Sequence, residues 1–293
     1  MSRSAQATPP SRTGIVVPAV LALLTAGVGL ILWSMQSATP GELEHEEASA
    51  FSTIRIRRDG DIRLLTFVRD NGQEAVQTRI NLSAPHSLQS PYARGMFTSY
   101  LYQPNPRRVL IVGLGGGAIV RFLTHYEPDA QIAAVEIDPV VVKLADQYFG
   151  ARTGGNVRIH TADAVKFIEA TSDRYDLIMM DAFLRPSGDT DTTGVPKGLK
   201  TIEFLQRLKL TLAPGGVVAF NVNEHESMTE DIAAVTTAFG HAAVYRCFPA
   251  RNKVVIATEN GLASDDELRG RIQALDARLK GALAFDELLK NRE

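Results

Sequence analysis

The sequence predicts an α/β protein whose main sheet is parallel and ends in an antiparallel hairpin. From residue 108 onward, short apolar runs alternate with helical stretches, which is typical of βαβ units. Two further β-rich runs at 242–248 and 253–258 are joined by the short segment 249–252, so we expect a hairpin there and not another crossover. Residues 51–103 precede this region and predict a small β-rich unit.

The composition is that of an ordinary globular chain and excludes several classes of site. The 293 residues carry 31 Lys and Arg against 33 Asp and Glu, a net charge of −2, so no nucleic-acid partner is indicated. A lone cysteine, Cys247, excludes an intramolecular disulfide and a thiolate zinc site. The six histidines are scattered along the chain, and we therefore expect no metal.

The N-terminal residues predict a single-pass membrane anchor. No charged residue lies between Arg12 and Glu42, and a helix over residues 14–33 would be about 30 Å long, enough to cross a bilayer. A cleaved secretory signal is the alternative, but the apolar stretch is longer than a usual signal core. The arginines in the 1–13 tail place the N-terminus in the cytoplasm. The polar, acidic residues 34–50 predict a linker.

Antiparallel strands are expected to begin the small unit at 51–103. Alternating apolar residues there are accompanied by the turn-prone pairs Asp59-Gly60 and Asn71-Gly72. Residues 85–102 predict a helix, after which the prolines at 104 and 106 break the chain.

The Rossmann-like core is expected over residues 104–262. Its predicted parallel strands are 108–112, 132–136, 157–160, 177–181 and 217–221. Its predicted helices are 118–125, 139–148, 164–170 and 201–212. A capping box at 264–267 opens a C-terminal helix, which we expect to fill residues 263–293 with its leucines on one stripe.

A glycine-rich loop between the first strand and the first helix is the strongest local signal for function. Gly113, Gly115 and Gly117 lack a Cβ, so the backbone can approach a ligand there. The N–H groups of the following helix suit polar or anionic atoms. Glu136 ends the second strand, where a carboxylate can accept both hydroxyls of an adenosine ribose. Together these features predict an adenosine-bearing ligand; the alternative is a tight turn beside a solvated Glu136.

Two more acids follow strands of the predicted sheet. Asp163 follows the third strand and Asp181 ends the fourth, so both lie at the edge where open α/β sheets bind ligands. Asp163 is also well placed to be a helix N-cap. Asp181 follows four apolar residues and opens a long loop at 182–199, which favours a direct functional role.

The same loop fits the G-x-G-x-x-A fingerprint of dinucleotide-dependent oxidoreductases, through Gly113, Gly115 and Ala118. Two observations count against that interpretation. No second domain with a catalytic histidine or Lys–Tyr pair follows, and the closing hairpin favours the methyltransferase-like variant of the Rossmann sheet.

Residues 51–258, about 70% of the chain, resemble the spermidine synthase (polyamine aminopropyltransferase) family. PNPRRVLIVGLGGGAIVRFL resembles the PNPxxVLxIGGGDGGxxR segment of that family, and VEID at 135–138 resembles its acidic ribose motif. TADAVKFI at 161–168 is similar to its GDGxxF stretch, and MMDAF at 179–183 to its TDSSDP loop. Tyr92 stands 21 residues before Gly113, near the spacing of the family's substrate-pocket tyrosine.

The resemblance implies transfer of an aminopropyl group from decarboxylated S-adenosylmethionine to a small amine, as in polyamine biosynthesis. An amine of pKa about 10 is mostly ammonium at pH 7, so a carboxylate must take its proton. The resemblance assigns that base to Asp181. It also implies what the remaining site residues bind. Glu136 would hold the ribose, and Asp163 and Ala164 would contact the adenine. Gln77 would lie near the thioether, and Tyr92 together with Asp181 would bind the amine.

Three charged features of the family are missing. Its aspartate in GGGDGG falls on Gly116, its second loop aspartate falls on Leu184, and the His-Glu or Gln-Glu pair after the tyrosine is replaced by Ala93-Arg94. Each lost contact costs about 1.5–3 kcal/mol unless Asp189 or Asp191 of the loop substitutes.

These departures leave two alternatives open beside a divergent, membrane-anchored aminopropyltransferase. A methyltransferase could use S-adenosylmethionine itself, because Gly116 no longer repels its carboxylate. A non-catalytic nucleoside-binding module tethered to the membrane would also fit the thinned acidic pocket. From the family we further expect a homodimer.

Overall fold

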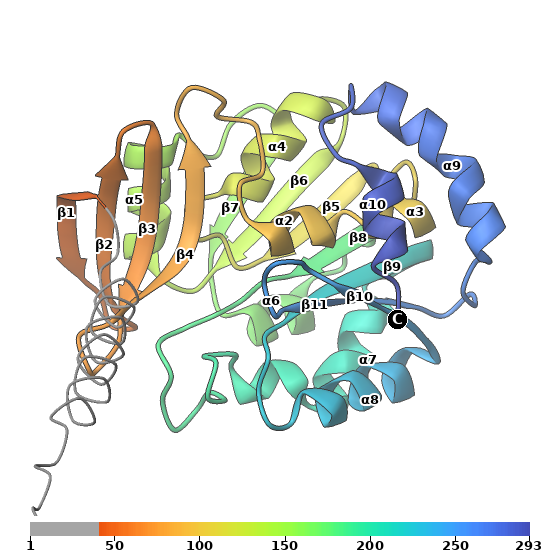
Figure 1. Cartoon of the computed structure of the whole chain (residues 1–293). Helices are drawn as coiled ribbons and strands as arrows, with labels where there is room; N and C mark the ends of the chain where they lie inside the picture. Colours follow the sequence, from red (N-terminus) through yellow and green to blue (C-terminus); the bar gives the residue numbers. More distant parts are fainter. Residues whose placement is uncertain (1–40) are drawn as a thin grey trace, which may run out of the picture. The chain divides into compact units, whose positions relative to one another are not determined.

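A seven-stranded sheet forms the centre of residues 41–293, the part of the chain that the computed structural model describes (Figure 1). In the order β10-β11-β9-β8-β5-β6-β7, the strands from β9 to β7 are parallel, and β11 and β10 are antiparallel to their neighbours. The predicted parallel sheet and closing hairpin are confirmed. The strands are β5 (Arg108–Val112), β6 (Gln131–Glu136), β7 (Val157–Thr161), β8 (Tyr175–Met180), β9 (Leu212–Val222), β10 (His241–Arg246) and β11 (Lys253–Thr258).

The chain changes direction across this sheet at β5. It runs outward from β5 through β6 to β7 and then returns to the other side of β5 as β8. Loops that leave the carboxyl ends of β5 and β8 therefore diverge, and such a switch point is where open α/β sheets hold ligands.

Helices cover both faces of the sheet (Figure 1). Val109 and Ile111 of β5 pack into one core, and Leu110 and Val112 pack into the other, because successive strand residues point to opposite faces. The first core includes α2 (Pro91–Met96), α3 (Ser99–Tyr102), α4 (Ala118–Tyr126), α9 (Asp265–Arg278) and α10 (Phe285–Lys290). The second includes α6 (Ala164–Ala170), the 3-10 helix η2 (Lys197–Lys200), α7 (Ile202–Leu210) and α8 (Met228–Phe239).

A separate antiparallel sheet precedes the core, as expected for the small unit. Its strands, in the spatial order β1-β2-β3-β4, are β1 (Glu42–Ala48), β2 (Thr53–Asp59), β3 (Ile62–Val68) and β4 (Glu74–Asn81). Its apolar face, with Ile54 and Leu65, packs against Val141 and Leu144 of α5 (Pro139–Phe149). Helix α5 thus joins the small sheet to the Rossmann-like core.

The opposite face of the small sheet is held by charge. Glu74 on β4 accepts hydrogen bonds from Arg55 (2.8 Å) and Arg57 (2.7 Å) of β2 and from Thr66 (2.9 Å) of β3. Burial alone would raise the pKa of Glu74, but these hydrogen bonds outweigh burial and lower the pKa to about 2. The carboxylate therefore stays ionised and ties three strands together.

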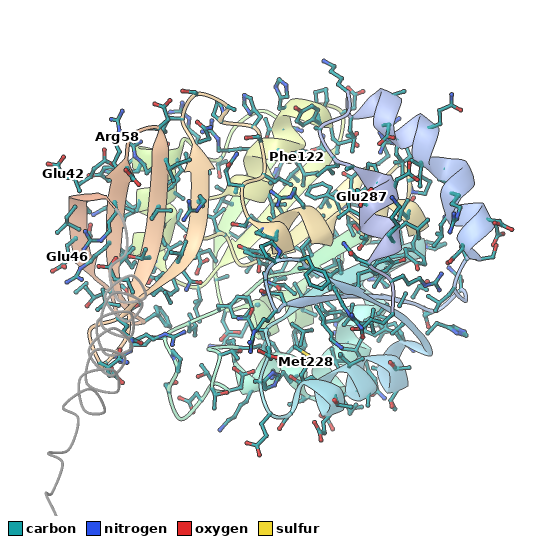
Figure 2. All side chains as sticks on the ribbon, viewed as in Figure 1. Glu42, Glu46, Arg58, Phe122, Met228 and Glu287 are labelled. Carbon is teal, nitrogen blue, oxygen red and sulfur yellow. The ribbon has the colours of Figure 1, made fainter. Side chains whose placement is uncertain are left out.

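Strand β1 corrects the prediction of a linker over residues 34–50. The pairing of β1 with β2 sets Glu42 opposite Arg58 and Glu46 opposite Arg55, and Figure 2 shows Glu42, Glu46 and Arg58 on this edge. Opposite charges across an antiparallel pair stabilise it. The acidic run is therefore an edge strand that complements the basic β2.

Two helical expectations are also corrected, and one further helix was not expected. The helix predicted at 85–102 is two short helices: Pro91 begins α2, and three-residue turns at Phe97 and Thr98 separate it from α3. The single helix predicted for 263–293 ends at Arg278 because Lys280 and the following glycine both have positive φ, and α10 follows. Helix α8 was not expected from its Ala- and Thr-rich sequence.

The prediction of a membrane protein is also corrected. Within residues 41–293, none of the helices combines the length and the apolar character needed to cross a bilayer. The expected span at 14–33 and the tail before it lie outside the described residues.

Candidate active site

A cavity of about 520 Å³ opens at the carboxyl ends of β5, β6 and β8. The three acids that the sequence singles out, Glu136, Asp163 and Asp181, all line it. Tyr92 and Gln77 line it from α2 and β4. The switch point therefore brings together residues that are up to 104 positions apart in the chain, from 77 to 181.

Glu136 is held rigidly at the end of β6. Its residue is only 9% exposed, and its two carboxylate oxygens accept N–H groups of Leu114 (2.9 Å) and Asp138 (3.0 Å). Burial raises the pKa of Glu136, while those two backbone hydrogen bonds act against the rise. A carboxylate has about four acceptor sites, so this group can still accept two hydroxyls from a ligand in the cavity.

Asp181 sits at the other side of the cavity, between two polar side chains. Asn221 of β9 donates from Nδ2 to Oδ1 of Asp181 at 2.7 Å, and the phenol of Tyr92, whose O–H donates to the carbonyl oxygen of Gln77, lies beside the same carboxylate. Burial raises the pKa of Asp181 to about 7, although the Asn221 hydrogen bond and the neighbouring Tyr92 phenol favour the ionised form. The phenol of Tyr92 stays protonated because burial, and then the charge of Asp181, raise its pKa well above the ordinary value. Asp181 can therefore exchange a proton near neutral pH.

Asn221 and its neighbours were missed by the sequence-based analysis of the site. Asn252, in the turn between β10 and β11, donates from Nδ2 to Oδ1 of Asn221 at 2.9 Å and also to Asn223. This orients the Asn221 amide so that its N–H group faces Asp181. Single asparagines 31 residues apart carry no motif, so only the fold reveals the chain of contacts.

The glycine loop brings the two acids together. Gly113 has φ of +95°, and a Cβ there would lie 2.2 Å from the carbonyl oxygen of Asp181. Gly113 and Gly115 line the cavity, as expected for cofactor-binding residues. Gly117 is not among the lining residues. It has φ of +71° at the start of α4, and a Cβ there would lie 2.2 Å from that of Ala151.

The remaining expected residues also line the cavity. Asp163 is the N-cap of α6, with Oδ1 accepting the N–H of Val165 at 2.8 Å, and it also lines the cavity. Ala164 follows it in the lining. Gln77 accepts the phenol hydrogen bond of Tyr92 at its backbone oxygen (3.2 Å), which joins the two residues on one wall.

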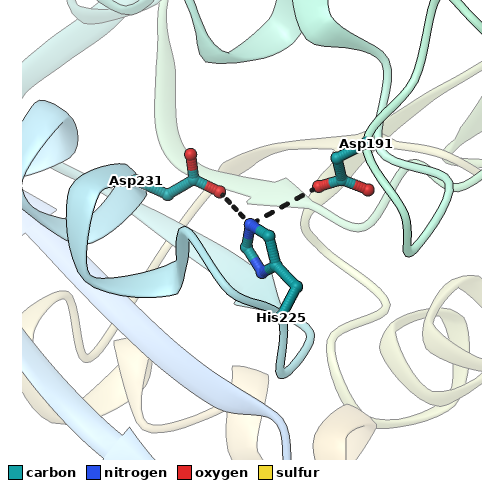
Figure 3. A group of neighbouring side chains, drawn as sticks. All are labelled: Asp191, His225 and Asp231. Carbon is teal, nitrogen blue, oxygen red and sulfur yellow. Dashed lines mark ion pairs between the residues drawn. The ribbon is translucent and has the colours of Figure 1, made fainter.

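Two acids of the 182–199 loop, Asp189 and Asp191, were candidates to replace the family's missing charged groups, and they lie in different places. Asp189 lines the cavity, whereas Asp191 bonds Lys200 outside it. Asp191, His225 and Asp231 form a cluster (Figure 3) in which Nε2 of His225 lies 3.0 Å from Asp231 and 3.7 Å from Asp191. Their spacing would suit a metal ion, but the Lys200 ammonium group bonds both aspartates and occupies that position. The cluster anchors the loop to α8.

The three departures from the family pattern have different structural settings. The N–H group of Gly116 donates to Thr78 (2.8 Å), which lines the cavity, and a Cβ on Gly116 would lie 3.0 Å from the ring of Phe149. Leu184 lines the cavity without a charge. Arg94 donates to the carbonyl oxygens of residues 88 and 89, so it has a structural role.

Comparison with known proteins agrees with this geometry. The polyamine aminopropyltransferase of Vibrio vulnificus is 30% identical over 246 residues, which cover 80% of this chain and 78% of that protein. A structure of human methyltransferase-like protein 13 in complex with SAH is 26% identical with a TM-score of 0.60, covering 65% of this chain and 92% of that one. A probable spermidine synthase from Corynebacterium glutamicum, 20% identical, shares the fold with a TM-score of 0.64 over 84% of this chain and 96% of that one.

The family model "Spermine/spermidine synthase domain" matches residues 96–262, more than half of the chain. This range contains the glycine loop, the acids Glu136, Asp163 and Asp181, and Asn221. The prediction that the chain is a transferase is confirmed at this level, and the chain belongs to the spermine/spermidine synthase family.

Proposed function

We propose that this protein transfers the aminopropyl group of decarboxylated S-adenosylmethionine to a small amine. One observation carries the proposal: a rigidly held Glu136 and a proton-exchanging Asp181 line the same cavity, on either side of the glycine loop. The first suits a ribose, and the second suits an amine that must lose a proton. The expected homodimer stays a prediction.

The donor would lie along the wall from β6 to β4. Glu136 accepts the ribose hydroxyls, and Asp163 and Ala164 flank the adenine. Gln77 lies toward the thioether. This order directs the sulfonium end of the donor toward Asp181 and Tyr92.

The acceptor would react at the corner formed by Asp181 and Tyr92. Its nitrogen forms a bond to the CH₂ next to the sulfonium, the C–S bond breaks with its electron pair left on sulfur, and methylthioadenosine departs. The proton from nitrogen goes to Asp181, whose Oδ1 is already held by Asn221. With a pKa of about 7, this carboxyl group can release the proton to solvent after each turnover.

Methyl transfer from S-adenosylmethionine is the second candidate. The likeness to human methyltransferase-like protein 13 in complex with SAH favours it. So does Gly116, because no carboxylate from that position reaches the cavity to select an ammonium group. The two candidates require different donors.

Donor affinity separates the two candidates. Asp181 gives the reacting end of the cavity a negative field when it is ionised, so the donor's terminal ammonium is favoured and a carboxylate beside it is repelled. Calorimetry should show at least tenfold tighter binding of decarboxylated than of intact S-adenosylmethionine. Tighter binding of the intact form would favour methyl transfer instead.

Replacing Asp181 tests the assigned base. Asp181→Asn keeps the shape of the side chain but cannot take a proton, so turnover should fall at least a hundredfold while donor affinity and thermal unfolding change little. Asp129→Asn is the matched control, since that side chain is 86% exposed. Steady-state release of methylthioadenosine measures the effect. Unchanged turnover in Asp181→Asn would remove this residue from the mechanism.

The pH profile tests how Asp181 is tuned. Because the base must be ionised, kcat/KM should rise with pH through about 7 and then level off. The Asn221 hydrogen bond favours the ionised form, so Asn221→Leu should move the midpoint to higher pH. The exposed Asn260→Leu should leave it in place. A midpoint that stays or falls in a folded Asn221→Leu variant would contradict the assignment.

A further inference from the structure

A second, polar cavity of about 300 Å³ adjoins the first beyond Tyr92. The two cavities share six lining residues: Phe67, Gln77, Tyr92, Phe183, Leu184 and Arg185. The donor is proposed to lie on the opposite side, along Glu136 and Asp163. The second cavity is therefore the space into which the rest of an acceptor extends once its nitrogen is beside Asp181. This inference rests on the proposed function.

The charge of this cavity is unusual for a site that would hold a diamine. None of its lining residues within 41–293 is acidic, and Arg69 and Arg185 both line it. Arg185 is paired with Asp70 at 2.6 Å. Arg69, in contrast, has no ion-pair partner in the described part of the chain. A second ammonium group placed here would meet a like charge and find no carboxylate.

The asparagine side chains that line this cavity also present hydrogen-bond donors. Asn221 donates to Asp181, and Asn252 donates to the side-chain oxygens of Asn221 and Asn223. The Asn223 side-chain oxygen accepts from Asn252, and the NH₂ group of Asn223 makes no hydrogen bond within residues 41–293, so this side chain can offer a hydrogen-bond donor to the cavity. An NH₂ group and a guanidinium group together suit an acceptor-only ligand atom, as in a carboxylate.

We propose that the acceptor is an amino acid whose amine and carboxylate lie at opposite ends, and not a diamine. The amine nitrogen attacks the CH₂ next to the sulfonium at the Asp181–Tyr92 corner. The new N–C bond replaces the C–S bond, methylthioadenosine leaves, and the proton passes to Asp181. The carboxylate takes no part in the reaction and binds to Arg69 and the Asn223 amide, giving an N-(3-aminopropyl) amino acid.

Three acceptors of one backbone length test this proposal: 4-aminobutanoate, 4-amino-1-butanol and 1,4-diaminobutane. With decarboxylated S-adenosylmethionine and the full-length chain, kcat/KM should be at least tenfold higher for 4-aminobutanoate than for 1,4-diaminobutane, with the alcohol between them. Mass spectrometry identifies each product. Arg69→Glu should remove or reverse this preference, whereas Arg174→Glu, an exposed arginine outside both cavities, should preserve it.

The outcomes separate this proposal from the function on which it rests. If the donor binds and 1,4-diaminobutane is alkylated as well as or better than 4-aminobutanoate, the amino-acid proposal is wrong and aminopropyl transfer stands. A preference for 4-aminobutanoate that survives Arg69→Glu would overturn the role of this arginine as the carboxylate-binding group. If calorimetry shows no binding of the donor, both proposals fail together.

Discussion

The site depends on how closely two loops approach each other at the centre of the sheet. The backbone of Gly113 runs against that of Asp181, so closely that a Cβ on Gly113 would lie 2.2 Å from the Asp181 carbonyl oxygen. Only glycine fits this position without a shift of one loop. The same turn presents the Leu114 N–H group to Glu136. One close contact thus sets the relative positions of Glu136 and Asp181.

The surroundings give these two acids different properties. Glu136 is fixed by backbone N–H groups on both oxygens, so it is suited to accept hydroxyls without moving. Asp181 is held on one oxygen by Asn221 and is buried enough for its pKa to rise to about 7. Two carboxylates in one cavity can therefore serve binding and proton transfer separately.

Local sequence patterns were sufficient for much of the fold and the site. Strands 108–112 and 253–258 and helix 164–170 were predicted with their observed ends, because apolar runs and a capping aspartate mark them. The acids at strand ends were found for the same reason. Long-range pairing was not visible locally: β1 is strand-like only opposite the arginines of β2, and Asn221 and Asn252 meet only in the folded sheet. The close packing of Gly117 against Ala151 was likewise not visible in the sequence.

The central claim is that the buried Glu136 carboxylate receives a ribose and thereby directs the reacting end of an adenosine sulfonium compound toward Asp181. Calorimetric titration of 5′-methylthioadenosine and its 2′-deoxy analogue tests this most directly. The account predicts that 5′-methylthioadenosine binds and that loss of the 2′-hydroxyl weakens binding at least tenfold, with little difference between the two compounds in a folded Glu136→Gln variant. Equal affinity of the two compounds for the unaltered protein would contradict it.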